Sequence, residues 1–175
     1  MGAPRRVVLV GLPGAGKSTV GALVAARLGW RFVDLDAEIE RAAGRTVAQI
    51  FADDGESGFR LLEREATIAL RGQDGLVLAP GGGWAAVYAN REALGEGATL
   101  VYLQATPATA ARRLAAAPGV RPLVAGPDPE AELEKILAAR APSYLQANHT
   151  VTVDSMSADD VASIIVALVL GDVQD

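Results

Sequence analysis

Short apolar runs alternate along the chain with longer segments in which alanine, leucine and other helix formers recur at helical spacing. Several of the short runs are apolar throughout, as is typical of parallel strands that are covered on both faces. The predicted strands are residues 6–10, 32–34, 76–79, 100–103 and 150–153. The predicted helices are residues 18–28, 37–43, 47–52, 59–71, 85–94, 107–116, 129–146 and 158–170. This alternation of strands and helices predicts a right-handed, doubly wound α/β fold.

Two stretches interrupt the alternation. Three helical segments stand between the second and third strands, which is more than a simple crossover needs, so we expect them to form a small cap over one end of the sheet. Residues 118–127 are rich in proline and glycine and carry Arg121. This composition predicts a mobile loop, and binding residues often lie on loops that a rigid scaffold holds.

Composition narrows the class of protein. The 175 residues suit one domain, and half of them are hydrophobic, which is enough for a substantial core. The formal net charge of −5 disfavours nucleic acid and anionic lipid as partners. The absence of cysteine excludes disulfides and cysteine-ligated metals, and fits a reducing compartment. The most apolar stretch, residues 161–170, is short of the roughly 20 residues of a membrane span. We expect one domain over residues 1–175, monomeric and cytoplasmic, that binds neither nucleic acid nor membranes.

The first predicted strand is followed by GLPGAGKS, residues 11–18, which matches the phosphate-binding loop pattern. Backbone N–H groups of such a loop point inward at a phosphate, and the positive end of the following helix faces the same anion. Lys17 is expected to reach the β- and γ-phosphates, and the Ser18 hydroxyl to complete the shell of a Mg²⁺ ion. The predicted nucleotide-binding residues of the loop are Gly14, Ala15, Gly16, Lys17, Ser18 and Thr19. The loop therefore predicts a protein that binds a nucleoside triphosphate.

Residues beyond the loop indicate which kind of nucleotide-binding protein this is. A guanine-specific switch GTPase is excluded, because Asn90 and Asn148 are the only asparagines and neither begins an Asn-Lys-x-Asp motif. Asp34 and Asp36 end the second predicted strand, and alternation along an extended segment would place both carboxylates on one face at the carboxyl edge of the sheet. One suits the water shell of Mg²⁺, and the other can accept hydrogen bonds from substrate hydroxyls. The alternative is an exposed acidic turn that caps the next helix.

Three further motifs carry glycine or arginine. Arg60 and Glu63 are three residues apart on a predicted helix, so the glutamate could orient the guanidinium, although such a pair alone is most often a surface ion pair. Three glycines, residues 81–83, follow the third strand and permit close approach of a ligand to the backbone, with a flexible turn as the alternative. Two arginine motifs come later, Arg121-Pro-Leu in the loop and Arg140-Ala-Pro-Ser-Tyr144 at a helix end.

In this order and at these spacings, the phosphate loop, Asp-x-Asp, Phe-Arg-x-x-Glu, Gly-Gly-Gly, Arg-Pro-Leu and Arg-x-Pro-x-Tyr resemble the shikimate kinase family. The resemblance extends from residue 7 to about residue 153. It implies a five-stranded parallel sheet in a nucleoside-monophosphate-kinase-like P-loop core. It also implies a helical substrate-binding region at about residues 34–63 and a lid at about residues 113–127. The implied reaction is ATP- and Mg²⁺-dependent phosphorylation of the 3-hydroxyl of shikimate, in the biosynthesis of chorismate and aromatic amino acids.

The same resemblance implies roles on the nucleotide side of the site. Lys17 and Ser18 would hold phosphate and Mg²⁺, with Asp34 contacting the metal through water. Arg121 would come down with the lid onto the γ-phosphate, and Arg113 would stack on adenine.

On the acceptor side, the resemblance implies that Arg60 and Arg140 clamp the shikimate carboxylate. Asp36 would take the hydroxyls and is the candidate base, which makes Lys17, Asp36 and Arg121 the predicted catalytic residues. Gly81, Gly82 and Gly83 would support the ring by backbone contact. These roles agree with the residue chemistry, because guanidinium forks suit a carboxylate and an acceptor carboxylate suits hydroxyls.

The sequence departs from the family pattern at Trp84, where we expect a small residue, and between Arg113 and Arg121, which are separated by a slightly longer segment than usual. Two alternatives remain. Another small-molecule P-loop kinase, of gluconate or nucleotide type, is disfavoured by the two arginines, although Trp84 could reshape the pocket. A non-catalytic nucleotide-binding regulator is disfavoured by the intact Lys17, Asp34, Asp36 and Arg121.

Overall fold

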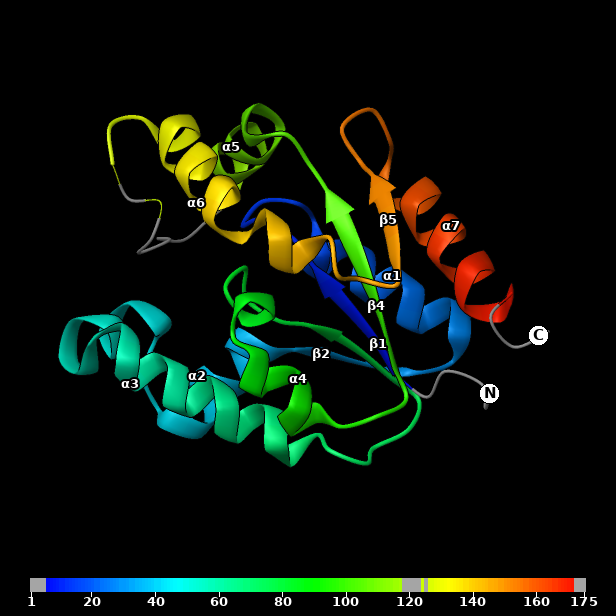
Figure 1. Ribbon diagram of the computed structural model, residues 1–175, viewed down its shortest axis with the longest axis horizontal. Coiled ribbons are helices and arrows are strands. Elements are labelled where there is room, and N and C mark those ends of the chain that lie inside the picture. The colour runs from blue at the N-terminus through cyan, green and yellow to red at the C-terminus, as the bar shows by residue number, and fades with distance from the viewer. Residues whose placement is uncertain (1–5, 118–123, 125, 172–175) are drawn as a thin grey trace.

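The computed structural model describes residues 6–117, 124 and 126–171 (Figure 1). Its five strands are β1 (Arg6–Val10), β2 (Arg31–Asp34), β3 (Leu76–Ala79), β4 (Ala98–Gln104) and β5 (His149–Thr152). They form one sheet in the order β2-β3-β1-β4-β5, and every neighbouring pair is parallel. The predicted five-stranded parallel sheet is therefore confirmed. Because all strands run the same way, their carboxyl ends meet at one edge, where ligands bind in such folds.

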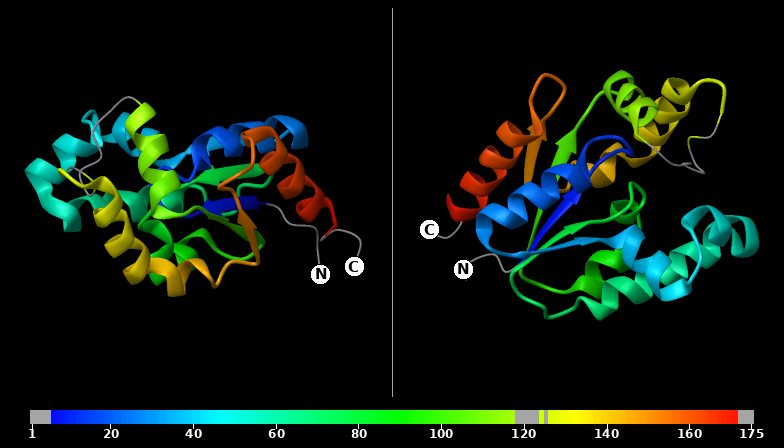
Figure 2. Two further views of the ribbon diagram at one scale, coloured as in Figure 1. Left: turned by 90° about the horizontal axis from the view of Figure 1, so that it is seen from above. Right: turned by 180° about the vertical axis from the view of Figure 1, so that it is seen from behind.

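Helices cover both faces of this sheet. They are α1 (Lys17–Leu28), α2 (Leu35–Ala43), α3 (Val47–Ala69), α4 (Tyr88–Leu94), α5 (Pro107–Ala116), α6 (Pro129–Tyr144) and α7 (Ala158–Gly171), with a 3₁₀ turn, η1 (Trp84–Ala86), after β3. Figure 2 shows α1 and α7 side by side on one face. The helices α2, α3, α4 and α6 lie toward the other face and share a second core cluster.

The central strand β1 shows why the short runs are apolar throughout. Val7 and Leu9 pack into the cluster under α1 and α7, whereas Val8 and Val10 pack into the cluster on the opposite face. Alternate side chains of a strand point to opposite faces, so a strand covered on both sides has no position left for a polar residue.

The region between β2 and β3 holds the helical segments that were predicted. The expected helices 47–52 and 59–71 are the two halves of α3, which meet at a kink where Gly55 is not helical. Gly55 has φ 71° and ψ −178°, a left-handed conformation that glycine adopts without steric cost. Helical geometry is interrupted at this residue, so three helical segments, α2 and the two halves of α3, lie beyond the carboxyl end of β2 (Figure 1).

The remaining differences are at element ends and at the expected lid. Helix α2 begins at Leu35 rather than at residue 37, β4 extends over Ala98–Gln104, and the expected helix 85–94 is divided into η1 and α4. Most of the expected mobile loop, residues 118–127, lies outside the described residues, and so does Arg121. Among the described residues, no helix has the length and apolar character that crossing a membrane requires.

Candidate active site

The phosphate-binding loop connects β1 to α1 and depends on glycines at two close approaches. A Cβ atom on Gly11, which has φ 148°, would lie 2.6 Å from the carbonyl oxygen of Leu103. A Cβ atom on Gly14, which has φ 83°, would lie 2.4 Å from the carbonyl oxygen of Ala110. Both residues must therefore be glycine for the loop to pass under β4 and α5.

Lys17 and Ser18 are the first residues of α1, so their positions are fixed by the end of the loop. The Lys17 side chain is 9% exposed, and its Nζ donates to the carbonyl oxygens of Gly11 and Leu12, both at 2.8 Å. This places the ammonium inside the curve of the loop, on the side where a bound phosphate would lie.

The Ser18 hydroxyl donates to Asp34 Oδ2 at 2.8 Å. The other Asp34 oxygen accepts from the backbone N–H of Ala37 at 3.2 Å and caps α2. The capping alternative is therefore confirmed for Asp34, and its role at a metal stays a prediction. A hydroxyl and a carboxylate at this distance are oxygen ligands of the type that Mg²⁺ prefers, with phosphate oxygens and water completing its shell. No group of three or more potential metal-ligating side chains occurs among the described residues, so phosphates are needed to complete such a site.

Asp36 does not lie on an extended segment beside Asp34, as was predicted. The strand ends at Asp34, and Asp36 lies in the first turn of α2. Asp36 nevertheless faces the same cavity, because its Oδ1 atom would lie 3.2 Å from a Cβ atom on Gly81.

The glycine turn after β3 brings the acceptor-side residues together. A Cβ atom on Gly81 would meet Asp36, one on Gly82 would meet Arg140 Nη1 at 3.2 Å, and one on Gly83 would meet Arg60 Nη2 at 2.2 Å. Each glycine thus leaves room for one of the three side chains predicted to bind the acceptor. The absence of three side chains lets two guanidinium groups and a carboxylate approach the same short stretch of backbone.

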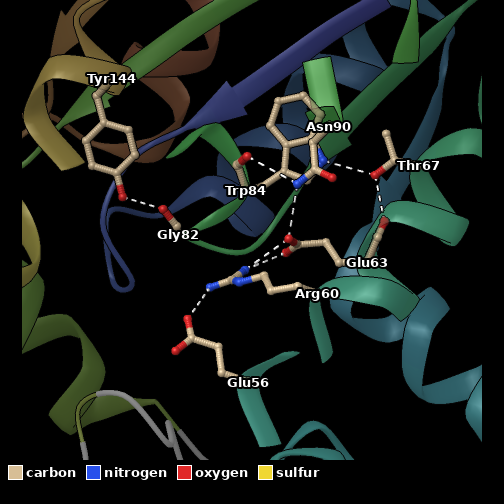
Figure 3. Close-up of polar contacts among 8 residues, drawn as sticks. All are labelled: Glu56, Arg60, Glu63, Thr67, Gly82, Trp84, Asn90 and Tyr144. Carbon is tan, nitrogen blue, oxygen red and sulfur yellow. Dashed lines mark hydrogen bonds and ion pairs between the residues drawn. The ribbon is translucent and has the colours of Figure 1, made fainter. Parts of the chain in front are cut away.

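Arg60 is bound by Glu63, which lies one helical turn further along α3 as predicted. Its Nη1 donates to both Glu63 oxygens at 3.0 Å, and its Nη2 donates to Glu56 at 3.2 Å (Figure 3). Glu63 is 0% exposed, so this is a buried ion pair rather than a surface one. Burial raises the pKa of Glu63, and the Arg60 charge opposes that rise.

Arg140 lies near the end of α6, whose last turn is fixed from two sides. The Tyr144 hydroxyl donates to the Gly82 carbonyl oxygen, and Arg91 Nη2 donates to the Ser143 carbonyl oxygen at 2.7 Å (Figure 3 draws the first contact). Burial raises the pKa of Tyr144 to about 12, so the hydroxyl keeps its proton at neutral pH. Arg140 Nη1 is buried and finds no acceptor within the described part of the chain.

Arg113 lies at the other end of the site. It donates from Nη1 to the Ala15 carbonyl oxygen at 2.9 Å and from Nη2 to the Val153 carbonyl oxygen at 3.0 Å. The guanidinium therefore joins the phosphate-binding loop to the chain just after β5.

One cavity of about 860 Å³ is lined by residues of the phosphate-binding loop, α2, α3, the glycine turn, α5 and α6. Its lining includes every described residue to which a binding or catalytic role was assigned: Gly14, Ala15, Gly16, Lys17, Ser18, Thr19, Asp34, Asp36, Arg60, Gly81, Gly82, Gly83, Arg113 and Arg140. The structure thus gathers these residues at the carboxyl edge of the sheet, and their individual roles remain predictions.

A family model described as shikimate kinase matches residues 13–169. The chain belongs to the shikimate kinase family. A curated shikimate kinase of Symbiobacterium thermophilum is 46% identical over 160 residues, which cover 90% of this chain and 91% of that protein. The solved structure of shikimate kinase from Acinetobacter baumannii in complex with shikimate superposes with a TM-score of 0.89 at 36% identity, covering 98% of this chain and 96% of that one.

The same fold occurs in a gluconokinase from Sinorhizobium meliloti, with a TM-score of 0.61, 20% identity, and coverage of 99% of this chain and 93% of that one. Membership of the shikimate kinase family confirms the resemblance that the six motifs carry, and the enzyme is a kinase.

Trp84, the departure from the shikimate kinase pattern, does not line the cavity. It is 0% exposed, and its Nε1 donates to Thr67 Oγ1 at 3.0 Å (Figure 3). Thr67 in turn donates to the Glu63 carbonyl oxygen at 2.7 Å. The indole therefore packs behind the glycine turn against α3, and the concern that it reshapes the pocket is not supported.

Asn90 is a buried member of this network that sequence reasoning did not assign. Its Nδ2 donates to Glu63 Oε1 at 3.1 Å and to the Trp84 carbonyl oxygen at 3.3 Å. Asn90 thus ties α4 to the carboxylate that holds Arg60. The sequence contains no signal for this contact, because the two residues are far apart in the chain and Asn90 belongs to no motif.

Proposed function

We propose that this kinase transfers the γ-phosphoryl group of ATP to the 3-hydroxyl of shikimate, in the biosynthesis of chorismate. The observation that carries the proposal is the glycine turn, at which Asp36, Arg60 and Arg140 converge within the cavity of the phosphate-binding loop. Two guanidinium groups and one carboxylate complement an acceptor that has a single carboxylate and several hydroxyls.

On the acceptor side, Arg60 and Arg140 bind the carboxylate of shikimate, with the backbone of residues 81–83 beside the ring. Arg140 Nη1 supports this assignment, because a buried guanidinium nitrogen without an acceptor among the described residues favours an anion. Asp36 accepts hydrogen bonds from the ring hydroxyls.

On the nucleotide side, Lys17 and the backbone of Gly14, Ala15, Gly16 and Thr19 bind the phosphates. Ser18 and, through water, Asp34 hold Mg²⁺, which when bound neutralises the charge that develops on the phosphates. Arg113 lies against the loop and supplies a planar surface for adenine, and Arg121, outside the described residues, is assigned to the γ-phosphate.

The reaction is an in-line attack of the hydroxyl on the γ-phosphorus. Because the transition state of phosphoryl transfer is loose, positioning and charge neutralisation supply most of the acceleration. Asp36 receives the hydroxyl proton as general base, a role worth about 10²-fold to 10³-fold.

We further infer that residues 1–175 act as one domain, with acceptor binding over about residues 34–63 and a lid over about residues 113–127. We also infer a cytoplasmic monomer, and the net charge of −5 supports the absence of nucleic acid and membrane partners.

A coupled assay of ADP release tests the proposal over shikimate, gluconate, quinate and nucleoside monophosphates. We expect turnover with shikimate at a kcat/KM at least about tenfold above any other acceptor. Preference for gluconate or for a nucleotide would refute the acceptor assignment but would not affect the assignment of the phosphate-binding loop.

A further inference from the structure

The guanidinium of Arg60 is bound by two carboxylates in very different surroundings. Glu63 is 0% exposed and accepts from Nη1 with both oxygens. The side chain of Glu56 is 58% exposed and accepts from Nη2 through a single contact of 3.2 Å. Glu63 is thus a fixed partner, which Asn90 also binds, whereas Glu56 binds Arg60 from an exposed position.

The Nη2 atom that donates to Glu56 is also the Arg60 atom that reaches the acceptor side of the cavity. Of the three Arg60 atoms near Gly83, Nη2 would come closest to a Cβ atom on that residue, at 2.2 Å. A guanidinium binds a carboxylate through two neighbouring N–H groups, and Nη1 is already bound to Glu63. An acceptor carboxylate that reaches Arg60 therefore competes with Glu56 for Nη2.

We propose that Glu56 is a specificity-determining residue that occupies Arg60 in place of the acceptor carboxylate and is displaced by it. The inference rests on the proposed function, because it requires an acceptor that carries a carboxylate. An acceptor without one does not displace Glu56 and leaves the Arg60–Glu56 pair intact. The exchange thus favours acceptors whose carboxylate binds Arg60 better than a half-exposed glutamate does.

The position of Glu56 makes the exchange possible. It is the first residue after the kink at Gly55, and it lies four residues before Arg60 on the same helix. Solvent-exposed ion pairs shift an equilibrium by at most about fivefold, so the pair weakens acceptor binding without preventing it. When displaced, the Glu56 carboxylate can return to water without a desolvation cost.

A different role for Glu56 would have the opposite effect. If Glu56 accepted hydrogen bonds from the ring hydroxyls, its removal would weaken acceptor binding. The direction of the change therefore distinguishes the two roles.

The test compares Glu56→Gln with Asp53→Asn. Asp53 is a matched control because its side chain is 61% exposed, lies on the same segment and is paired with Arg45 instead of Arg60. Either substitution removes one negative charge from α3, so a general charge effect would appear in both variants. Titration calorimetry would measure the Kd of shikimate and of its methyl ester, which lacks the carboxylate charge, and steady-state kinetics would give KM for ATP.

We expect Glu56→Gln to lower the Kd of shikimate about twofold to fivefold, with the Kd of the ester and KM for ATP unchanged. Asp53→Asn should leave all three values within error of the wild type. A higher or unchanged Kd of shikimate in Glu56→Gln would overturn this inference. So would an equal decrease in the Kd of the ester, or an equal decrease in the Kd of shikimate in Asp53→Asn. None of these results would affect the proposed function. Wild-type protein that binds no shikimate would refute the proposed function as well.

Discussion

Replacing Gly83 with alanine tests the placement of the Arg60 guanidinium separately from its charge. The backbone of Gly83 has φ −89°, which alanine adopts without strain. Its new Cβ atom would lie 2.2 Å from Nη2, 2.8 Å from Cζ and 2.9 Å from Nη1 of Arg60. Ordinary contacts between such atoms need about 3.5 Å, so the guanidinium must withdraw by about 1 Å or more.

The size of the effect follows from what the displaced arginine loses. Charge-assisted hydrogen bonds between a carboxylate and a guanidinium stabilise the bound carboxylate by about 1.5–3 kcal/mol. Their loss corresponds to a decrease in affinity of about 10-fold to 100-fold. We expect kcat/KM for shikimate to fall by this factor in Gly83→Ala. The clash involves the end of a flexible side chain, so we expect a stability loss of at most about 2 kcal/mol, or about 4–8 °C in Tm for a chain of this size.

The assay is ADP release with shikimate and ATP varied in turn, together with thermal unfolding. Gly171→Ala is the control, because a Cβ atom there has no heavy atom within 4 Å and the residue ends α7, away from the cavity. Its kinetic constants should equal those of the wild type. An unchanged kcat/KM for shikimate in Gly83→Ala, or an equal rise in KM for ATP, would show that the position of Arg60 does not control acceptor binding.

Three further predictions concern single side chains. Lys17→Ala should retain less than about a tenth of the wild-type kcat while its circular dichroism spectrum is preserved, and higher turnover would remove Lys17 from the catalytic residues. Asp36→Asn should lower kcat/KM for shikimate by about 10² or more while KM for ATP stays normal. Asp34→Asn should instead chiefly raise the Mg²⁺ concentration needed for half-maximal activity. A loss of only a few-fold in Asp36→Asn would leave Asp36 a positioning residue and not a general base. Burial raises the pKa of Glu63 above its unfolded value of about 4.3, so its contribution to stability is fully present below that value and is lost as pH rises through the folded pKa. Urea unfolding should therefore show the stability of wild type relative to Glu63→Gln decreasing with pH across this interval, and a constant difference would contradict the raised pKa.

Much of the fold could be predicted because it depends on local patterns. Parallel strands buried on both faces are continuous apolar runs, as in β1, and the phosphate-binding loop has a spacing that its backbone geometry imposes. The pairing of Arg60 with Glu63 was also predictable, because residues three apart on a helix are neighbours.

The errors arose where one pattern permitted two structures. The residues around Gly55 were left out of both predicted helices, but only Gly55 itself departs from helical geometry. Asp36 was assigned to an extended segment, although an aspartate followed by helix-forming residues is also a helix cap, as Asp34 proves to be.

The contacts that position the acceptor-side residues could not be predicted from any local pattern. Asn90 reaches Glu63, Trp84 reaches Thr67 and Tyr144 reaches Gly82 across long stretches of chain. Such contacts depend on how the elements pack, and neither periodicity nor residue spacing encodes them.

The order of strands places most of the acceptor side of the pocket in one stretch of the chain. Strand β2 is at the edge of the sheet and pairs only with β3, so residues 34–83 form an uninterrupted stretch that leaves the sheet at β2 and returns through β3. This stretch supplies Asp36, Arg60 and the glycine turn, while the phosphate-binding loop precedes it in the chain and Arg140 follows it. A gene fragment for the stretch could therefore be exchanged between related kinases to graft a new acceptor preference. The incoming fragment would have to keep Asp34 beside Ser18 and a turn that fits Arg140 and the hydroxyl of Tyr144.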